Sequence, residues 1–406
     1  MVPKPAAATA EQVLAAKVIR SYERTNDKFD PWLTNGHVQT IMGAYLKDIC
    51  SYVPKWTAIF FFVKCLFKLM MGHEASSIWT NRESLDTPDG DVFHVDFVMT
   101  QNFTGASADE APWVILCHGL ESNAASTTSM DLASGYLKNG MNVACLNYRT
   151  CDGTHNKKLG CYHFGFTSDL QQYIDYLRND KKYKGPIYLS GFSLGANLVL
   201  YYLGKLGKDA IRQNIHGGAV LCAPLNQEIN QHTLNAKGFN RNVYVANLLS
   251  TLKARAEWQY KEFCEGKPNA PQFDYPAAMK ATTLMEFDDA YTAPVYGFKD
   301  CWDYYRQTSS IHHLDNIHVP TMIVNAKNDV FFEPTLWPTK KSCEHGGPAP
   351  LKMIQESVGG HLGFMFHRVP QSDQRLKSPG PSWVATELSD FIKHVHASTG
   401  TTTGGK

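Results

Sequence analysis

The sequence predicts an α/β fold with a mostly parallel central sheet, flanking helices and an inserted helical cap. From residue 86 onward, short apolar runs alternate with segments of helical periodicity, as in parallel strands joined by helices. A glycine-flanked turn at 191–195 connects one apolar run directly to an apolar helix. Residues 223–318 separate two later strands and are too many for a simple crossover. We therefore interpret them as a cap over the carboxyl edge of the sheet.

The individual elements follow from local patterns. Asp89-Gly90 forms a turn before an alternating run that fits an edge strand, whereas the other strands are continuous apolar runs. The expected strands are 91–99, Trp113–Cys117, Asn142–Asn147, 187–189, 218–222 and 321–325, and 351–354 is a further apolar segment. The expected helices are 126–139, 167–178, 196–203 and, within the cap, 242–264.

Composition excludes several classes of protein. The 406 residues include 39 Lys and Arg and 38 Asp and Glu, so the net charge of +1 argues against a nucleic-acid binder. The ten cysteines form no CxxC pair, and several lie within apolar runs. This pattern indicates buried, reduced thiols in an intracellular protein rather than a zinc or disulfide framework.

Residues 1–85 are expected to form an N-terminal extension, 86–397 the main domain and 398–406 a flexible tail. The extension begins without a signal-peptide core and contains the longest apolar stretch, 56–71, whose 16 residues fall short of the roughly 20 that a spanning helix needs. Lys64 and Lys68 share one helical face, so the segment is amphipathic. Two interpretations stay open, an anchor at a membrane surface and a helix packed on the domain. We expect a cytoplasmic protein or one associated peripherally with a membrane.

Gly191-Phe192-Ser193-Leu194-Gly195 is a complete G-x-S-x-G motif between an apolar strand and an apolar helix. In this context a serine sits on a sharp, strained turn that raises its hydroxyl above the sheet edge. Side chains in place of the flanking glycines would collide with the neighbouring strand and helix. The amino end of the following helix would direct its partial positive charge at a developing oxyanion. The motif therefore predicts Ser193 as a nucleophile.

A serine nucleophile needs a base and an acid that orients the base. In this arrangement the acid and then the histidine follow the serine along the chain. Asp329 comes just after the strand 321–325, where a carboxylate can reach the edge that carries Ser193. His361 is flanked by Gly359, Gly360 and Gly363, which would let a mobile loop bring the imidazole beside the serine. We predict that Ser193, Asp329 and His361 form a catalytic triad.

Other polar residues are weaker candidates. Asp288 and Asp289 lie in the predicted cap, before the buried strand. His312, His313 and His318 are close in sequence, but their spacing fits no common metal site. No Walker loop, dinucleotide fingerprint or HExxH motif is present, so the sequence implies neither a metal nor a cofactor.

An oxyanion hole needs two N–H donors. Leu194, the residue after the nucleophile, is expected to supply one of them. The loop after Trp113–Cys117 reads His118-Gly119-Leu120-Glu121, and its glycine allows the backbone to approach the substrate. We assign the second donor to the backbone of Leu120.

Further motifs carry a resemblance to a known family. They are the segment 31–40 (PWLTNGHVQT), His118-Gly119-Leu120-Glu121, Asn147-Tyr148-Arg149, the segment 191–197 (GFSLGAN), Phe287-Asp288-Asp289, Tyr304-Tyr305, Asn325-Ala326 and the segment 359–364 (GGHLGF). In this order the chain resembles AB hydrolase family 4, which includes YheT-type esterases, mammalian phospholipases and monoacylglycerol lipases, and fungal medium-chain acyltransferases. The resemblance implies that Ser193, Asp329 and His361 occupy the family's charge-relay positions.

The chain departs from the family pattern at three places. The segment 47–80 is longer than the usual connection. Thr150 follows Asn147-Tyr148-Arg149 where the family has glycine. Asn328-Asp329-Val330 replaces Asp-Asp-Pro, which leaves Asp329 as the single acid there.

These observations predict an α/β-hydrolase fold and a serine hydrolase that cleaves carboxylic esters through an acyl-serine intermediate. The resemblance implies an acylglycerol, a phospholipid or a medium-chain fatty acyl ester as substrate. Two alternatives stay open: an acyltransferase that passes the acyl group to an alcohol, and a non-catalytic lipid-binding protein on the same scaffold. We expect a small-molecule or lipid ester as partner, no nucleic acid, and 56–71 as a candidate membrane contact. The oligomeric state is left open.

Overall fold

The computed structural model describes residues 8–24, 28–50, 77–100, 111–267, 272–333, 337–364, 367 and 380–400. The amphipathic segment 56–71 lies outside these residues. None of the helices in the described ranges is long and apolar enough to cross a membrane.

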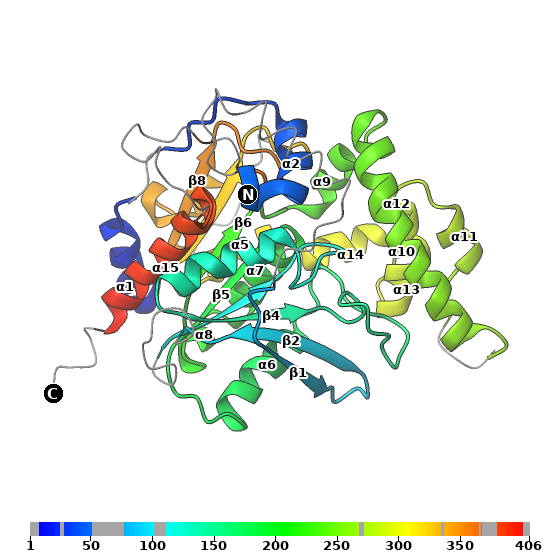
Figure 1. Cartoon of the computed structure of the whole chain (residues 1–406), viewed down its shortest axis with the longest axis horizontal. Coiled ribbons are helices and arrows are strands. Elements are labelled where there is room, and N and C mark those ends of the chain that lie inside the picture. The colour runs from blue at the N-terminus through cyan, green and yellow to red at the C-terminus, as the bar shows by residue number, and fades with distance from the viewer. Residues whose placement is uncertain are drawn as a thin grey trace.

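An eight-stranded sheet forms the centre of the protein, in the order β1-β2-β4-β3-β5-β6-β7-β8 (Figure 1). The strands are β1 (Asn81–Asp86), β2 (Val92–Val98), β3 (Trp113–Cys117), β4 (Asn142–Asn147), β5 (Ile187–Phe192), β6 (Ile215–Leu221), β7 (Thr321–Ala326) and β8 (Leu351–Glu356). The pairs β1–β2 and β2–β4 are antiparallel, and the strands from β4 to β8 are parallel. The expected mostly parallel sheet is confirmed.

The prediction that 91–99 is an edge strand is wrong. This run forms β2, which lies between β1 and β4, and β1 occupies the edge. Strand β1 reads NRESLD and buries only Leu85, so it lacks the apolar pattern that identified the other strands. Because β1 starts at Asn81, it also crosses the expected boundary between the N-terminal extension and the main domain at residue 86.

Helices cover both faces of the sheet. The helices before the cap are α1 (Ala10–Ser21), α2 (Gly36–Cys50), α5 (Thr127–Lys138), α6 (Ser168–Asn179), α7 (Leu194–Leu206) and α8 (Asp209–Arg212), and α15 (Trp383–Gly400) follows β8. One hydrophobic cluster joins the sheet to α1, α5 and α15, and a second joins the opposite face to α6 and α7. Side chains of β3 alternate between the clusters, with Ile115 in one and Leu116 in the other, which explains why a strand buried on both faces is apolar throughout.

A helical insertion connects β6 to β7 and extends to one side of the sheet (Figure 1). It contains α9 (Gln227–Leu234), η2 (Asn240–Val245), α10 (Ala246–Gln259), η3 (Tyr260–Cys264), α11 (Tyr275–Lys280), α12 (Leu284–Phe287), η4 (Asp288–Thr292), α13 (Ala293–Tyr296) and α14 (Cys301–Thr308), followed by the short turns η5 (Ser310–His312) and η6 (Leu314–Asn316). Residues from α9 to η4 share a hydrophobic cluster of their own. The later residues Tyr304, Tyr305 and Leu314 belong instead to the main core. The predicted cap therefore has a separate core in its first part only.

Both ends of the described chain pack into the main body. Ala16 and Ile19 of α1 lie in the same cluster as α5 and α15. Helix α15 continues to Gly400, so residues 398–400 of the expected flexible tail are helical, and 401–406 lie outside the described residues. Two turns of 3₁₀ helix, η8 (Thr339–Lys341) and η9 (Cys343–His345), precede β8.

Candidate active site

Ser193 occupies a strained turn between β5 and α7. Its φ of 52° and ψ of −121° lie outside the regions that a residue with a side chain ordinarily adopts. A Cβ atom on Gly191 would lie 2.5 Å from the Gly195 carbonyl oxygen, and one on Gly195 would lie 2.1 Å from the Cys117 carbonyl oxygen. The turn therefore requires both glycines, for the steric reason that the motif indicated.

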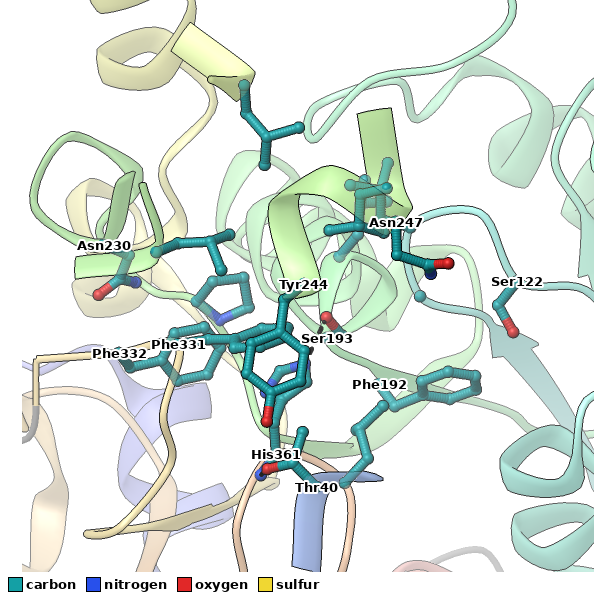
Figure 2. A pocket seen from close by; sticks show the side chains of 18 of the residues that line it. Thr40, Ser122, Phe192, Ser193, Asn230, Tyr244, Asn247, Phe331, Phe332 and His361 are labelled. Carbon is teal, nitrogen blue, oxygen red and sulfur yellow. Dashed lines mark hydrogen bonds between the residues drawn. The ribbon is translucent and has the colours of Figure 1, made fainter. Parts of the chain in front are cut away.

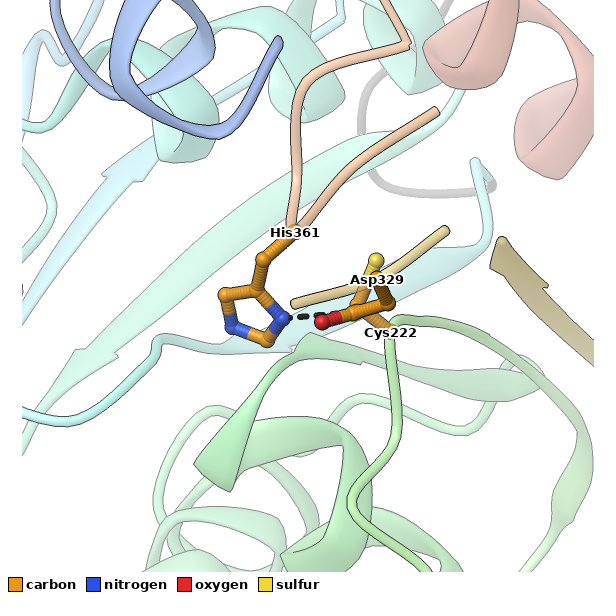
Figure 3. Close-up of side chains that lie close together, drawn as sticks. All are labelled: Cys222, Asp329 and His361. Carbon is orange, nitrogen blue, oxygen red and sulfur yellow. Dashed lines mark hydrogen bonds and ion pairs between the residues drawn. The ribbon is translucent and has the colours of Figure 1, made fainter. Parts of the chain in front are cut away.

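Ser193, His361 and Asp329 lie in one hydrogen-bonded chain at the carboxyl ends of the strands. His361 Nε2 is 2.9 Å from Ser193 Oγ, and His361 Nδ1 is 2.8 Å from Asp329 Oδ2. Dashed lines mark the first contact in Figure 2 and the second in Figure 3. The second oxygen of Asp329 accepts the Phe331 backbone N–H at 2.9 Å. A carboxylate only accepts hydrogen bonds, so Nδ1 carries the imidazole proton and Nε2 is left to accept the serine hydroxyl.

Aromatic rings fix the plane of the imidazole. Phe331 stacks on His361 with ring centroids 4.2 Å apart, and Phe332 packs edge-on at 5.1 Å. Tyr244, from the insertion, packs edge-on against Phe331 at 4.9 Å. The imidazole is only 5% exposed and is thus shielded from bulk water.

The loop that carries His361 is held by the segment around the start of α2. Thr40 Oγ1 accepts the His361 N–H at 2.8 Å, and Gln39 Oε1 accepts the Gly359 N–H at 3.0 Å. Asn328 Oδ1 accepts the Gly360 N–H at 2.9 Å.

The glycines of this loop serve close packing. A Cβ atom on Gly363 would lie 2.4 Å from the Gln39 carbonyl oxygen, and one on Gly360, whose φ is +61°, would lie 2.7 Å from the Gly36 carbonyl oxygen. The glycines therefore allow the loop to press against α2, and the predicted mobility of the loop stays a prediction.

The candidate oxyanion loop lies directly against the serine. A Cβ atom on Gly119 would be 3.2 Å from the Cβ atom of Ser193, so the backbone passes next to the hydroxyl. Leu120 and Leu194 both line the cavity at Ser193. Within the described ranges, neither backbone amide donates a hydrogen bond to another residue. The assignment of these two amides as oxyanion donors stays a prediction.

A cavity of about 680 Å³ opens above Ser193, between the sheet edge and the insertion. Its walls include Phe192, Leu234, Val243 and Leu248 (Figure 2 shows part of the lining). The polar residues of the lining are uncharged amides and hydroxyls together with His361. The cavity is large enough for a drug-sized molecule, and most of its surface is apolar.

The weaker candidates from the sequence are engaged elsewhere. Asp288 accepts hydrogen bonds from Tyr305 and Thr292, both at 2.6 Å, and Asp289 accepts the Cys301 N–H. His313 packs edge-on against Tyr201, and His318 Nδ1 lies 3.2 Å from Thr9 Oγ1.

One group of potential metal ligands exists among the described residues, formed by Cys222, Asp329 and His361 (Figure 3). The Cys222 sulfur accepts the Leu362 N–H at 3.3 Å, and the other two side chains bond to each other. Contacts within the protein therefore explain why these three side chains lie close together.

Sequence reasoning missed the residues that support the site. Thr40 and Gln39 belong to the motif 31–40, to which the sequence assigned no role. That this motif is shared with the family, although it is far from the triad in the chain, could have indicated a part in the site. Arg255 of α10 bonds to Glu121 in the candidate oxyanion loop, and no sequence pattern indicates this because the two residues are 134 positions apart.

Comparisons with known proteins agree with this architecture. Residues 112–368 match the family model described as alpha/beta hydrolase fold, and the chain belongs to this family. YheT of Escherichia coli (strain K12), a candidate esterase, is 30% identical over 87% of this chain and 92% of its own length.

Two relatives from Saccharomyces cerevisiae are more distant. Medium-chain fatty acid ethyl ester synthase/esterase 2 is 25% identical over 70% of this chain, and this chain spans 62% of it. A monoacylglycerol lipase is 24% identical over 71% of this chain and 61% of its own length.

Proposed function

We propose that the protein is a serine hydrolase of carboxylic esters. The observation that carries this proposal is the chain of short contacts from Asp329 through His361 to the strained Ser193, beneath an apolar cavity. The names of the relatives, an esterase, an ester synthase/esterase and a lipase, point to the same chemistry.

In the proposed mechanism, His361 Nε2 takes the proton of Ser193 while Oγ attacks the ester carbonyl carbon. The backbone amides of Leu120 and Leu194 stabilise the negative charge that develops on the carbonyl oxygen. Asp329 holds the imidazole tautomer and stabilises the imidazolium. His361 then gives this proton to the alcohol as the ester bond to it breaks, which leaves an acyl-serine. A water molecule that loses a proton to His361 attacks the acyl carbon, the bond to Ser193 Oγ breaks, the acid is released, and His361 returns the proton to Oγ.

The lining of the cavity favours substrates that are uncharged on both sides of the ester. Among the described residues around it, no Lys, Arg, Asp or Glu contributes to the wall. A phosphate group in this cavity would lose its water without gaining a cationic partner, at a cost of several kcal/mol. We therefore propose that the substrates are neutral acylglycerols or fatty acyl esters rather than phospholipids.

The proposal is tested by hydrolysis of p-nitrophenyl esters from acetate to palmitate, with Ser193→Ala as the blank. We expect activity that depends on Ser193 and is best at one range of chain lengths. In a second panel, 1-decanoylglycerol should have at least a tenfold higher kcat/KM than the decanoyl lysophospholipid with the same chain. Turnover retained by Ser193→Ala would refute the mechanism, and equal rates in the second panel would refute the neutral-substrate preference.

Acyl transfer is the second candidate function, because one relative is named as both a synthase and an esterase. The same acyl-serine could react with an alcohol in place of water. Adding ethanol to the assay and measuring ethyl ester against free acid separates the two outcomes.

For the location of the protein, we propose the cytoplasm or the surface of a membrane. The eight cysteines among the described residues are free thiols, and seven of them are buried. Such thiols are typical of a reducing compartment. Flotation of the protein with lipid vesicles, with and without 56–71, tests the membrane contact.

A further inference from the structure

We propose that Glu121 and Arg255 are positioning residues that clamp the oxyanion loop to α10, so that the helical insertion sets the position of the Leu120 amide. This inference rests on the proposed function and assigns a role to two side chains outside the triad. It begins from the conformation of the loop itself.

The oxyanion loop is a tight turn in a conformation that suits glycine. The Gly119 carbonyl accepts the Ser122 N–H at 3.2 Å, which makes Leu120 and Glu121 the two central residues of a β-turn. Glu121, in the third position, has a φ of +57°. A side chain in this left-handed region costs roughly 1–2 kcal/mol relative to the usual conformation. The turn therefore needs support from outside its own backbone.

Two side chains supply that support at Glu121. Arg255 donates two hydrogen bonds to the carboxylate, at 2.6 Å to Oε1 and 2.9 Å to Oε2. The Tyr162 hydroxyl accepts the Glu121 N–H at 2.9 Å and donates to Oε1 at 2.7 Å. The side chains of Arg255 and Glu121 are only 13% and 8% exposed, so this two-pronged ion pair is largely shielded from water.

His118 holds the other end of the turn. Its Nε2 accepts the Tyr148 N–H at 3.1 Å, so Nδ1 carries the proton and donates to the Gly119 carbonyl at 2.8 Å. Burial lowers the pKa of His118 to about 4, which keeps the imidazole neutral in neutral solution. In a trans peptide the C=O and the N–H point in opposite directions. A Gly119 carbonyl directed at His118 therefore turns the Leu120 N–H away from His118.

The clamp joins this amide to the wall of the cavity. Helix α10 supplies Leu248 to the lining and Arg255 to the clamp, and these residues are seven positions apart. Seven positions are close to two helical turns, so both side chains lie on one face of the helix. A substrate packed against Leu248 thus contacts the same rigid element that fixes the oxyanion loop.

The alternative is an ion pair that only stabilises the fold. The two roles differ in which state of the reaction they affect. A displaced Leu120 amide weakens binding of the transition state and leaves binding of the ground state nearly intact. A general loss of stability lowers the amount of active protein and leaves the relative affinities of the two states unchanged.

The test compares wild type with Arg255→Lys, which keeps the charge but cannot donate two parallel bonds, and with Glu121→Gln. Each protein is assayed for kcat and KM, for the rate at which a fluorophosphonate labels Ser193, and for inhibition by two ligands. An alkyl trifluoromethyl ketone forms an oxyanion adduct with the serine, whereas the matching methyl ketone mainly fills the cavity. We expect kcat, the labelling rate and the trifluoromethyl ketone affinity to fall about tenfold or more. KM and the methyl ketone affinity should change less than threefold.

Arg306→Gln is the control, because Arg306 pairs with Glu228 inside the insertion at 3.0 Å and its own side chain is 60% exposed. It should change none of these quantities by more than twofold. Equal weakening of both ketones in the clamp variants, or no change in either, would overturn the proposal. The absence of Ser193-dependent labelling in the wild-type protein would instead refute the proposed function, and this inference with it.

Discussion

The hydroxyl of Thr40 accepts the backbone N–H of His361 at 2.8 Å and donates to the Gly36 carbonyl at 2.7 Å. The first turn of α2 is thereby tied to the peptide of the histidine that faces Ser193. The two residues are 321 positions apart in the chain.

Thr40→Val should remove this tie while preserving the shape of the side chain. The buried His361 N–H then loses its acceptor, at a cost of about 1–3 kcal/mol. Because the imidazole shifts from Ser193, we expect kcat for the best p-nitrophenyl ester to fall about tenfold or more. Thr40→Ser retains the hydroxyl and should stay within twofold of wild type. Equal activity of Thr40→Val and Thr40→Ser would contradict this role.

Gly195→Ala should prevent the fold from forming. Its Cβ atom would stand 2.1 Å from the Cys117 carbonyl oxygen, which belongs to the backbone of β3 and has no room to move. We expect loss of soluble protein, measured by expression and circular dichroism. Gly380→Ala is the control, because no atom of the described residues lies within 4 Å of the added one, and it should change the free energy of unfolding by less than about 0.5 kcal/mol.

Thr150→Gly should stabilise the protein. Thr150 has a φ of +74°, a conformation that is costly for a β-branched residue and ordinary for glycine. We expect the free energy of unfolding in urea to rise by about 1 kcal/mol, after the larger entropy of glycine in the unfolded chain is subtracted. Thr150→Ala keeps a Cβ atom and should gain less. A Thr150→Gly protein less stable than wild type would show that the strain is small.

Asp288 should make stability depend on pH. Burial in the insertion raises its pKa to about 6, even though Thr292 and Tyr305 donate hydrogen bonds to the carboxylate. A pKa above the unfolded value of about 3.9 means that the folded state holds the proton more tightly. This contribution to stability is complete below pH 4 and is lost as the pH rises through 6.

The measurement is urea unfolding of wild type and Asp288→Asn between pH 4 and pH 8. Wild type should lose up to about 3 kcal/mol relative to the variant over this range. A constant difference between the two proteins would show that Asp288 does not titrate there.

Local sequence patterns predicted the central elements well. Strands β3 and β4 coincide with the continuous apolar runs that predicted them, because both faces of each strand are covered. The expected helix 126–139 corresponds to α5, and the side chain of Ser126 caps the amino end of this helix. Strand β1 escaped prediction because a polar edge strand has no periodic apolar face.

Some residues of the candidate site could likewise be predicted from local sequence patterns, and others could not. Ser193 is marked by its strand–turn–helix context, and Asp329 by the end of a buried strand. The contacts that hold His361 and Leu120 come from α2 and α10, and they depend on tertiary packing between segments far apart in the sequence. No local pattern encodes such a pairing, so a single sequence leaves it unseen.

The bond between Thr40 and His361 also constrains how the protein is assembled during synthesis. At about 5–20 residues per second, a ribosome needs roughly 15–65 s to make the 321 residues that separate the two partners. Throughout that time the segment that supports the histidine loop is present without the loop it will hold. The hydrolytic machinery can therefore be completed only after His361 has been made, and a nascent chain that stops short of His361 would carry the nucleophile without its base.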